Sequence, residues 1–220
     1  MHERPPSERL QRQALAQIAE SKRMVLAVRH ALAQRQPATV LITSAAPHEG
    51  KSLLGASLAS AAVSMGEERI LVMDLNWYRP ALHQFFGRDL LHTSDEIATR
   101  PLADVIDSGG EGEPDRLLAP TDHDQVAGSA LNGPAVARRL ITSARELYDT
   151  IFIDTASVFP TNRMMMDPVM LASMVDGVMM VIQSRSTARQ QAKRAYKTIE
   201  LSGANIIGAV LNHSESLGRA

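Results

Sequence analysis

The stretch Thr39-Val-Leu-Ile-Thr-Ser-Ala-Ala-Pro-His-Glu-Gly-Lys-Ser52 decides the fold of this chain. It begins as an apolar, β-branched run, breaks into a short loop, and is followed by small and apolar residues that suit a helix from Lys51. Residues 45–52 match the phosphate-binding P-loop, G-x-x-x-x-G-K-S/T, with alanine at the first glycine. A strand, loop and helix in this order direct backbone N–H groups and the helix dipole at an anion. The stretch therefore predicts a polyphosphate site.

The residues of this loop have separate expected roles. The Lys51 ammonium is expected to contact the outer phosphates, and the Ser52 hydroxyl to ligate the Mg²⁺ that accompanies them. The remaining candidate phosphate-binding residues are Ala46, Pro47, His48, Glu49, Gly50 and Leu53. The alternative interpretation, a solvated helix N-terminus, does not explain the strand pattern before the loop and the helix pattern after it.

Length and composition favour one globular domain, since the chain has 220 residues, of which 45% are hydrophobic and 21% charged. We expect this domain over residues 20–212, with a tail and helix start at 1–19 and a short tail at 213–220. The net charge of −1 provides no general attraction to nucleic acid or anionic lipid. The sequence has no cysteine, which excludes disulfides and cysteine-ligated metals. No apolar run reaches the ~18 residues of a membrane span, so we expect a cytoplasmic protein without direct membrane insertion.

Five apolar runs resemble buried strands and alternate with segments of helical pattern. The runs are residues 39–43, 69–74, 150–154, 177–183 and 206–211. They show no alternating polar face, which is typical of parallel strands buried on both sides. The expected fold is therefore α/β, a mostly parallel sheet flanked by helices on both faces. Residues 92–133, rich in Gly, Pro, Asp and Ser, are expected to form loops, with a helical fragment near residues 102–106. We also expect a loose tail over residues 1–9, a helix over 164–175, and a helix over 187–201 that is capped by Ser186.

Two acids close apolar runs, Asp74 after residues 70–73 and Asp154 after residues 150–153. Strands often end in a polar residue simply because the chain reaches water. With a P-loop in the same sheet, however, these acids are the expected Walker-B-type carboxylates, which hold Mg²⁺ or position the attacking group. The predicted catalytic set is therefore Lys51, Asp74 and Asp154, and the predicted metal ligands are Ser52, Asp74 and Asp154.

Residues 44–52, 70–87 and 148–155 together resemble the Walker A, A′ and B motifs of the bacterial tyrosine kinases of the CpsD/CapB type. Residues 176–187 and 208–212 are also similar to that family. The resemblance implies a P-loop fold of the deviant Walker class (SIMIBI, ParA/MinD-like), with ATP and Mg²⁺ as cofactors and Asn212 among the nucleotide-binding residues. It further implies a role in capsule or exopolysaccharide biosynthesis, an inner-membrane polysaccharide co-polymerase as partner, recruitment to the membrane by that partner, and possible homo-oligomers.

The chain departs from the family pattern at several positions. Asn76 stands where the family has a second aspartate, and an amide brings no charge and cannot serve as a base. His48 replaces a glycine of the loop, where histidine tolerates a positive φ better than most residues. Further departures are Tyr78 in place of arginine, Ala156 in place of proline, and Leu26 in place of the last arginine of a Glu-x-x-Arg-x-x-Arg assembly motif.

The sequence also lacks the C-terminal tyrosine cluster on which the family's autokinases are phosphorylated. Its three tyrosines are Tyr78, Tyr148 and Tyr196, each within a segment predicted to be ordered. We therefore expect self-phosphorylation on a flexible tail to be impossible.

These observations lead to three hypotheses. The first is an ATP-binding protein of exopolysaccharide or capsule assembly with weak or absent autokinase activity. The second is an active tyrosine kinase that acts on another protein. The third is a ParA/MinD-like positioning ATPase, which is disfavoured because those proteins carry a lysine at the position of Ala46.

Overall fold

The computed structural model describes residues 6–66, 69–123, 133–159 and 166–213, with residues 6–16 described as backbone. Within these residues one sheet of six parallel strands has the order β3-β2-β4-β1-β5-β6. Its strands are β1 (Ala38–Ser44), β2 (Ile70–Asp74), β3 (Asp115–Leu117), β4 (Thr150–Asp154), β5 (Gly177–Gln183) and β6 (Ile206–Asn212). The predicted parallel α/β sheet is confirmed, and its central strand β1 leads into the P-loop.

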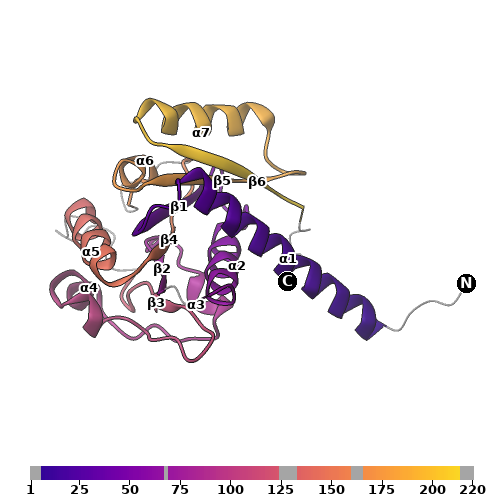
Figure 1. Ribbon diagram of the computed structural model, residues 1–220. Coiled ribbons are helices and arrows are strands. Elements are labelled where there is room, and N and C mark those ends of the chain that lie inside the picture. The colour runs from indigo at the N-terminus through magenta and orange to yellow at the C-terminus, as the bar shows by residue number, and fades with distance from the viewer. Residues whose placement is uncertain (1–5, 67–68, 124–132, 160–165, 214–220) are drawn as a thin grey trace, which may run out of the picture.

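Helices cover both faces of this sheet (Figure 1). They are α1 (Pro6–Ala31), α2 (Lys51–Val63), α3 (Leu82–Phe85), α4 (Ser94–Thr99), the 3-10 helix η1 (Leu102–Asp104), α5 (Gly133–Leu147), α6 (Pro168–Ala172) and α7 (Arg189–Leu201). Helices α1, α2 and α3 pack on one face, and α5, α6 and α7 pack on the other. The N-terminal part of α1 extends beyond the rest of the fold in Figure 1.

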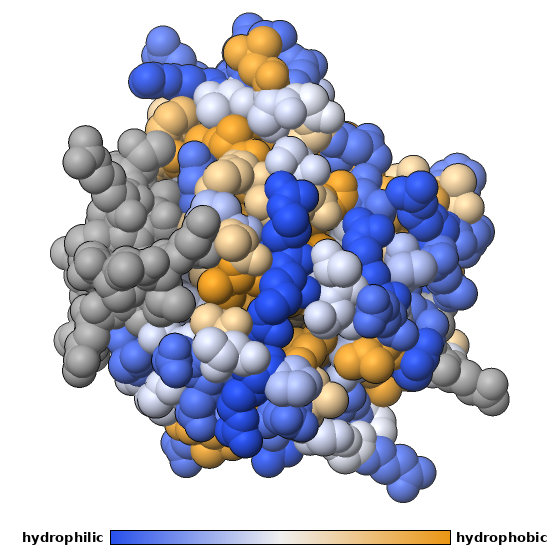
Figure 2. Space-filling view, turned by 90° about the vertical axis from the view of Figure 1, so that its left-hand side faces the viewer, coloured by the Kyte–Doolittle hydropathy of each residue, from blue (hydrophilic) through white to orange (hydrophobic). Residues whose placement is uncertain are grey.

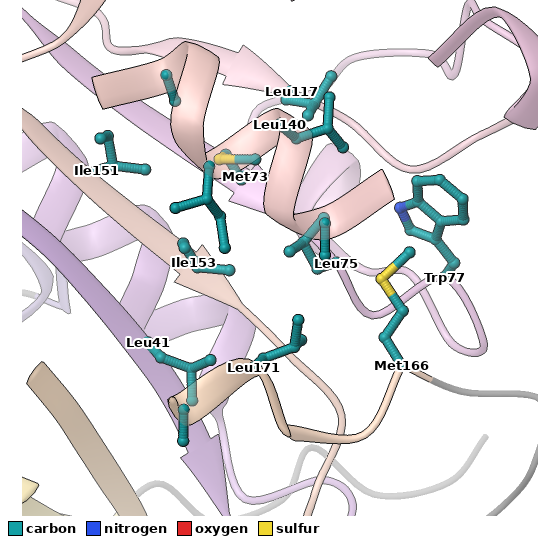
Figure 3. Close-up of a cluster of buried hydrophobic side chains, with 14 of the residues drawn as sticks. Leu41, Met73, Leu75, Trp77, Leu117, Leu140, Ile151, Ile153, Met166 and Leu171 are labelled. Carbon is teal, nitrogen blue, oxygen red and sulfur yellow. The ribbon is translucent and has the colours of Figure 1, made fainter. Parts of the chain in front are cut away.

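Alternate residues of β1, β2, β4 and β5 enter two separate hydrophobic cores. Ile42 and Phe152 pack with α1 and α2, whereas Leu41 and Ile153, one position earlier and later, pack with Leu140 of α5 on the opposite face (Figure 3). All five side chains are fully buried. Because each such burial is worth about 1.5–3 kcal/mol, both faces of the sheet must be covered, which explains the strands' lack of a polar face.

Strand β3 lies inside the segment that the sequence pattern predicts to be loops, and that prediction is wrong for residues 115–117. Three residues are too few to show a period, and the strand depends on long-range contacts. Arg116 has no exposed side-chain surface, and its Nε donates to Asp107 Oδ2 at 2.6 Å. Its Nη1 donates to Glu113 Oε2 at 3.0 Å. This buried ion-paired arginine fixes the hairpin that carries β3 to the edge of the sheet.

Three helix boundaries also differ from the sequence pattern. Helix α1 begins at Pro6, where we expect a tail over residues 1–9, and runs unbroken to Ala31. Helix α6 has five residues, Pro168–Ala172, and is shorter than the helix expected over residues 164–175. Residues 164 and 165 of that expected helix lie outside the described residues. Helix α7 begins at Arg189 with Ala188 as its N-cap, so the predicted start at Thr187 with a Ser186 cap is wrong. The Thr187 hydroxyl bonds to Glu49 of the P-loop.

No helix in the described ranges is long and apolar enough to cross a membrane. Figure 2 shows the side of the molecule that carries α4, α5 and α6, where small hydrophobic areas are separated by hydrophilic side chains. Such interspersed apolar side chains are normal for a water-exposed surface.

Candidate functional site

The loop between β1 and α2 has a backbone that only particular residues can adopt. His48 has φ 63° and Gly50 has φ 93°, both in the left-handed region. A Cβ on Gly50 would lie 2.3 Å from Asn212 Nδ2, so any other residue would have to displace the Asn212 side chain and adopt a strained φ. His48 adopts the positive φ that its side chain tolerates, as predicted. Helix α2 begins at Lys51, which places its N-terminus at the loop.

Lys51 lies inside this loop, with only 6% of its surface exposed. Its Nζ donates to Ser44 Oγ at 3.0 Å, and Ser44 Oγ in turn donates to the carbonyl oxygen of Ala46 at 2.6 Å. Burial lowers the pKa of Lys51, while the nearby charges of Asp154 and Glu49 act to raise it. A hydroxyl uses one of the three ammonium donors, which leaves the others for an anion.

The two acids predicted from the strand ends lie side by side. Asp74 of β2 and Asp154 of β4 are paired in register, and both are fully buried. Burial, followed by the charge of Asp154, raises the pKa of Asp74; burial also raises the pKa of Asp154, against the opposing hydrogen bond from Ser52. The predicted meeting of both acids with the P-loop is therefore observed.

Asp154 has the arrangement of a metal ligand together with Ser52. The Ser52 hydroxyl donates to Asp154 Oδ2, whereas Oδ1 is buried and has no hydrogen-bond partner among the described residues. A buried carboxylate oxygen without a partner is costly unless a ligand satisfies it. Mg²⁺ prefers such oxygen ligands and uses one or two protein groups plus phosphates and water. Ser52 and Asp154 thus fit Mg²⁺, although the described residues contain no group of three His, Asp or Glu suited to a metal.

Asp74 has a different environment, because both its oxygens accept backbone hydrogen bonds. Oδ1 accepts from the N–H of Asn76 at 3.0 Å, and Oδ2 accepts from the N–H of Leu82 at 3.2 Å. Asn76 Nδ2 donates to the carbonyl oxygen of Arg79 at 2.8 Å, and the N–H of Arg79 donates back to Asn76 at 3.0 Å. Asp74 therefore anchors the loop between β2 and α3, and Asn76 closes its turn. A metal-binding role for Asp74 stays a prediction.

A pocket of 520 Å³ opens above the P-loop. It is lined by Pro47, His48, Gly50, Lys51, Ser52, Leu53, Asn76, Tyr78, Arg79, Pro80, Ala81, Gln84, Phe85, Ala156 and Ser157. The predicted loop residues form one wall. The sequence pattern does not predict the other wall, from residues 78 to 85, because α3 reaches this place through the packing of Leu82 against α2 and the hydrogen bond from the Leu82 N–H to Asp74.

Five predicted site residues do not line the pocket, and four of them are Ala46, Glu49, Asp74 and Asn212. Glu49 Oε2 accepts from the N–H of Ala46 at 3.2 Å. Asn212 Nδ2 donates to the carbonyl oxygen of Glu49 at 3.0 Å, so the end of β6 contacts the P-loop backbone. Asp154 likewise does not line the pocket, although Ser52, which does, bonds to it.

Several known proteins can be aligned with this chain over most of the chain's length. Tyrosine-protein kinase YwqD of Bacillus subtilis is 26% identical over 190 residues, which cover 84% of this chain and 76% of YwqD. Tyrosine-protein kinase CpsD of Streptococcus agalactiae is 26% identical over 174 residues, covering 78% of this chain and 73% of CpsD. This chain is therefore similar over most of its length to bacterial tyrosine kinases of the CpsD type. No protein-family model matches it.

A third relative is much longer than this chain. The succinoglycan biosynthesis transport protein ExoP of Rhizobium meliloti is 25% identical over 194 residues, which cover 86% of this chain but only 24% of ExoP. The similarity to ExoP is thus limited to about a quarter of that protein.

Solved structures show the same fold. The kinase domain of VpsO superimposes with a TM-score of 0.77 at 24% identity, covering 95% of this chain and 98% of that domain. The septum site-determining protein MinD of Pyrococcus horikoshii, crystallised with Mg-ADP, has a TM-score of 0.65 at 19% identity, covering 80% and 70%. The chain therefore has the P-loop ATPase fold that the CpsD-type kinases share with MinD, a fold in which other members bind nucleotide and magnesium.

Proposed function

We propose that this protein binds ATP with Mg²⁺ and acts in exopolysaccharide or capsule biosynthesis, with weak or absent autokinase activity. The observation that carries the proposal is the hydrogen bond between Ser52 and Asp154 at the P-loop, which leaves Asp154 Oδ1 buried and without a partner among the described residues. The buried Lys51 ammonium lies in the same loop, where it bonds to Ser44. An anion at the N-terminus of α2 satisfies the loop N–H groups, and a divalent cation satisfies the carboxylate oxygen.

The chain's own residues would share the work of holding the nucleotide. Lys51 contributes a positive charge to the outer phosphates, and Gly50 allows the loop backbone to approach them closely. Ser52 and Asp154 would hold Mg²⁺, which neutralises charge on the phosphates during transfer. Asp74 fixes the loop that forms the opposite wall.

Weak phosphoryl transfer is supported by the groups that face the pocket. Transfer to a tyrosine is aided by a carboxylate that accepts the hydroxyl proton. Asn76 occupies the pocket wall but is an amide, and Asp74 already accepts two backbone hydrogen bonds. The described pocket lining contains no Asp or Glu that faces an incoming hydroxyl.

The names of the relatives support the proposed role in polysaccharide assembly. ExoP is a succinoglycan biosynthesis transport protein, and YwqD and CpsD are tyrosine-protein kinases. We infer that this chain likewise serves polysaccharide assembly through an inner-membrane co-polymerase partner, on its cytoplasmic side. A tyrosine kinase acting on another protein is the second candidate, favoured by the open wall at Tyr78 and Phe85, which leaves room for an acceptor side chain.

Titration calorimetry with ATP, with and without Mg²⁺, tests the proposal. We expect Mg²⁺-dependent binding that weakens by about 2–3 kcal/mol in Lys51→Met, the scale of a charge-assisted hydrogen bond. Lys193→Met, which removes an exposed lysine of α7, is the matched control and should bind as the parent protein does. Absence of ATP binding by the parent protein would overturn the proposal.

A second assay addresses transfer, with labelled ATP and a tyrosine-containing peptide. We expect a signal close to that of Lys51→Met. Strong tyrosine phosphorylation that disappears in Lys51→Met would refute weak activity and support the kinase that acts on another protein.

A further inference from the structure

We propose that Thr187 is a positioning residue for the nucleotide site, because its hydroxyl holds the buried carboxylate of Glu49 and thereby keeps the P-loop in its phosphate-receiving conformation. Thr187 lies between β5 and α7, outside the loop and outside the pocket lining. The inference rests on the proposed function, since it concerns the affinity of the same site for nucleotide.

Glu49 is the buried group that needs support. Only 2% of its surface is exposed, although it sits between two residues of positive φ in a short loop. A carboxylate buried to this degree is stable only when hydrogen bonds replace its water. Its Oε2 accepts from the N–H of Ala46 at 3.2 Å, a bond within the loop. Its Oε1 accepts from the hydroxyl of Thr187, a bond from outside the loop.

Thr187 is itself fixed to the end of a central strand. Its Oγ1 accepts from the N–H of Gln183 at 3.2 Å, and its own N–H donates to the carbonyl oxygen of Gln183 at 3.0 Å. Gln183 is the last residue of β5, which pairs with β1 in register. The same strand pair therefore carries both the P-loop and the residue that holds Glu49.

The opposite side of the loop is held by β6. Asn212 Nδ2 donates to the carbonyl oxygen of Glu49, next to Gly50. Glu49 is thus fastened through its side chain to the end of β5 and through its backbone to the end of β6. We call this arrangement of Thr187, Glu49 and Asn212 the loop clasp.

Loss of the Thr187 hydroxyl would leave Glu49 Oε1 without its donor in a buried position. The carboxylate would then move toward water, and the positive-φ conformations at His48 and Gly50 would lose their support. Nucleotide would bind only the fraction of molecules in which the loop keeps the observed conformation, so the apparent Kd rises by the inverse of that fraction. Preorganisation of this kind affects affinity without any contact between Thr187 and the ligand.

Calorimetry with ATP·Mg²⁺ on the full chain tests this positioning role. Thr187→Val keeps the shape and removes the hydroxyl, and we expect about a tenfold higher Kd. Thr187→Ser keeps the hydroxyl and should restore the parent affinity, which a role in packing alone would not predict. Thr198→Val, which removes a hydroxyl that bonds only to the backbone of α7, is the matched control and should leave Kd unchanged.

A double-mutant cycle with Glu49→Ala separates the loop clasp from general destabilisation. Once Glu49 is removed, Thr187→Val should raise Kd no further, because both substitutions break one interaction. Thermal unfolding confirms that each variant is folded, and Thr187→Ala replaces the valine variant if that one is not.

Two results would overturn the inference while leaving the proposed function intact: parent-like affinity in folded Thr187→Val, or fully additive effects in the cycle. A parent protein that binds no ATP overturns the proposed function instead.

Discussion

Replacing Asn76 by aspartate restores the carboxylate that the CpsD-type pattern has at this position, and it should reveal why this chain carries an amide. Asn76 Nδ2 donates to the carbonyl oxygen of Arg79 at 2.8 Å, a bond that no carboxylate can make. The backbone N–H of residue 76 bonds to Asp74, so the new negative charge would also lie close to the two buried carboxylates, Asp74 and Asp154. The variant should therefore be less stable but better equipped for proton acceptance.

The magnitude follows from these two effects. The lost amide hydrogen bond is worth about 1 kcal/mol, and turning a carboxylate oxygen toward the Arg79 carbonyl and a second carboxylate adds about as much again. A loss of about 2 kcal/mol lowers Tm by about 4–8 °C for a domain of this size. Mg²⁺ with nucleotide should recover more stability in Asn76→Asp than in the parent, because the cation neutralises the added charge.

Differential scanning fluorimetry with and without ATP·Mg²⁺ measures the change in stability. Transfer of labelled phosphate to a tyrosine peptide measures the change in activity, for which we expect at least about a tenfold gain. Asn205→Asp is the matched control, since Asn205 Nδ2 also donates to a backbone carbonyl, that of Asp176 at 2.9 Å, far along the chain from the pocket. The reasoning is refuted if Asn76→Asp melts like the parent, or if it loses stability and gains no transfer.

Three further predictions concern single positions. Gly50→Ala should weaken ATP binding at least about tenfold in calorimetry, because the strained φ and the contact with Asn212 Nδ2 together oppose a Cβ by about 2 kcal/mol; unchanged binding would show that the loop relaxes freely. Burial alone would raise the pKa of Asp176, but hydrogen bonds from Thr39 and neighbouring arginines lower it from 3.8, so its stabilisation is present above about pH 5 and is lost as pH falls below 3.8. Asp176→Asn should thus unfold about 2 kcal/mol more easily at pH 7, and its difference from the parent in urea titrations should shrink as pH falls below 3.8. Arg116→Met should reduce the free energy of unfolding by about 3 kcal/mol, measured in urea, since its carboxylate partners lose their buried cation; a neutral result would mean that this network contributes only geometry.

Much of the site could be predicted because its charged and hydroxyl-bearing residues directly follow or end apolar strands. Lys51 and Ser52 follow β1, and Asp74 and Asp154 end β2 and β4, so a parallel sheet necessarily brings them to one edge. The prediction needed only strand identity and direction, both of which follow from long apolar runs joined by helices.

The opposite wall of the pocket could not be found in this way. Residues 78–85 belong to a short helix and a turn without periodicity, and the packing of Leu82 against α2 together with its hydrogen bond to Asp74 brings them to the P-loop. Strand β3 was missed for a similar reason, since its three residues depend on the buried Arg116.

The sequence by itself determined five strands of the six-stranded sheet, the P-loop and the pair of acids, because hydrophobic patterns and a local loop conformation specify them within short segments. Only the tertiary structure decided how these parts are used. It shows that Asp154 Oδ1 lacks a partner within the described part of the chain, that both oxygens of Asp74 hold backbone, and that Thr187 and Asn212 fasten the loop from two strand ends. The bonds from Thr187 and Asn212 to Glu49 join residues 138 and 163 positions apart, and the bonds of Asp74 depend on the folded turn after β2. Neither kind of bond leaves a periodic trace in the sequence, because both form only once the fold has brought these groups together.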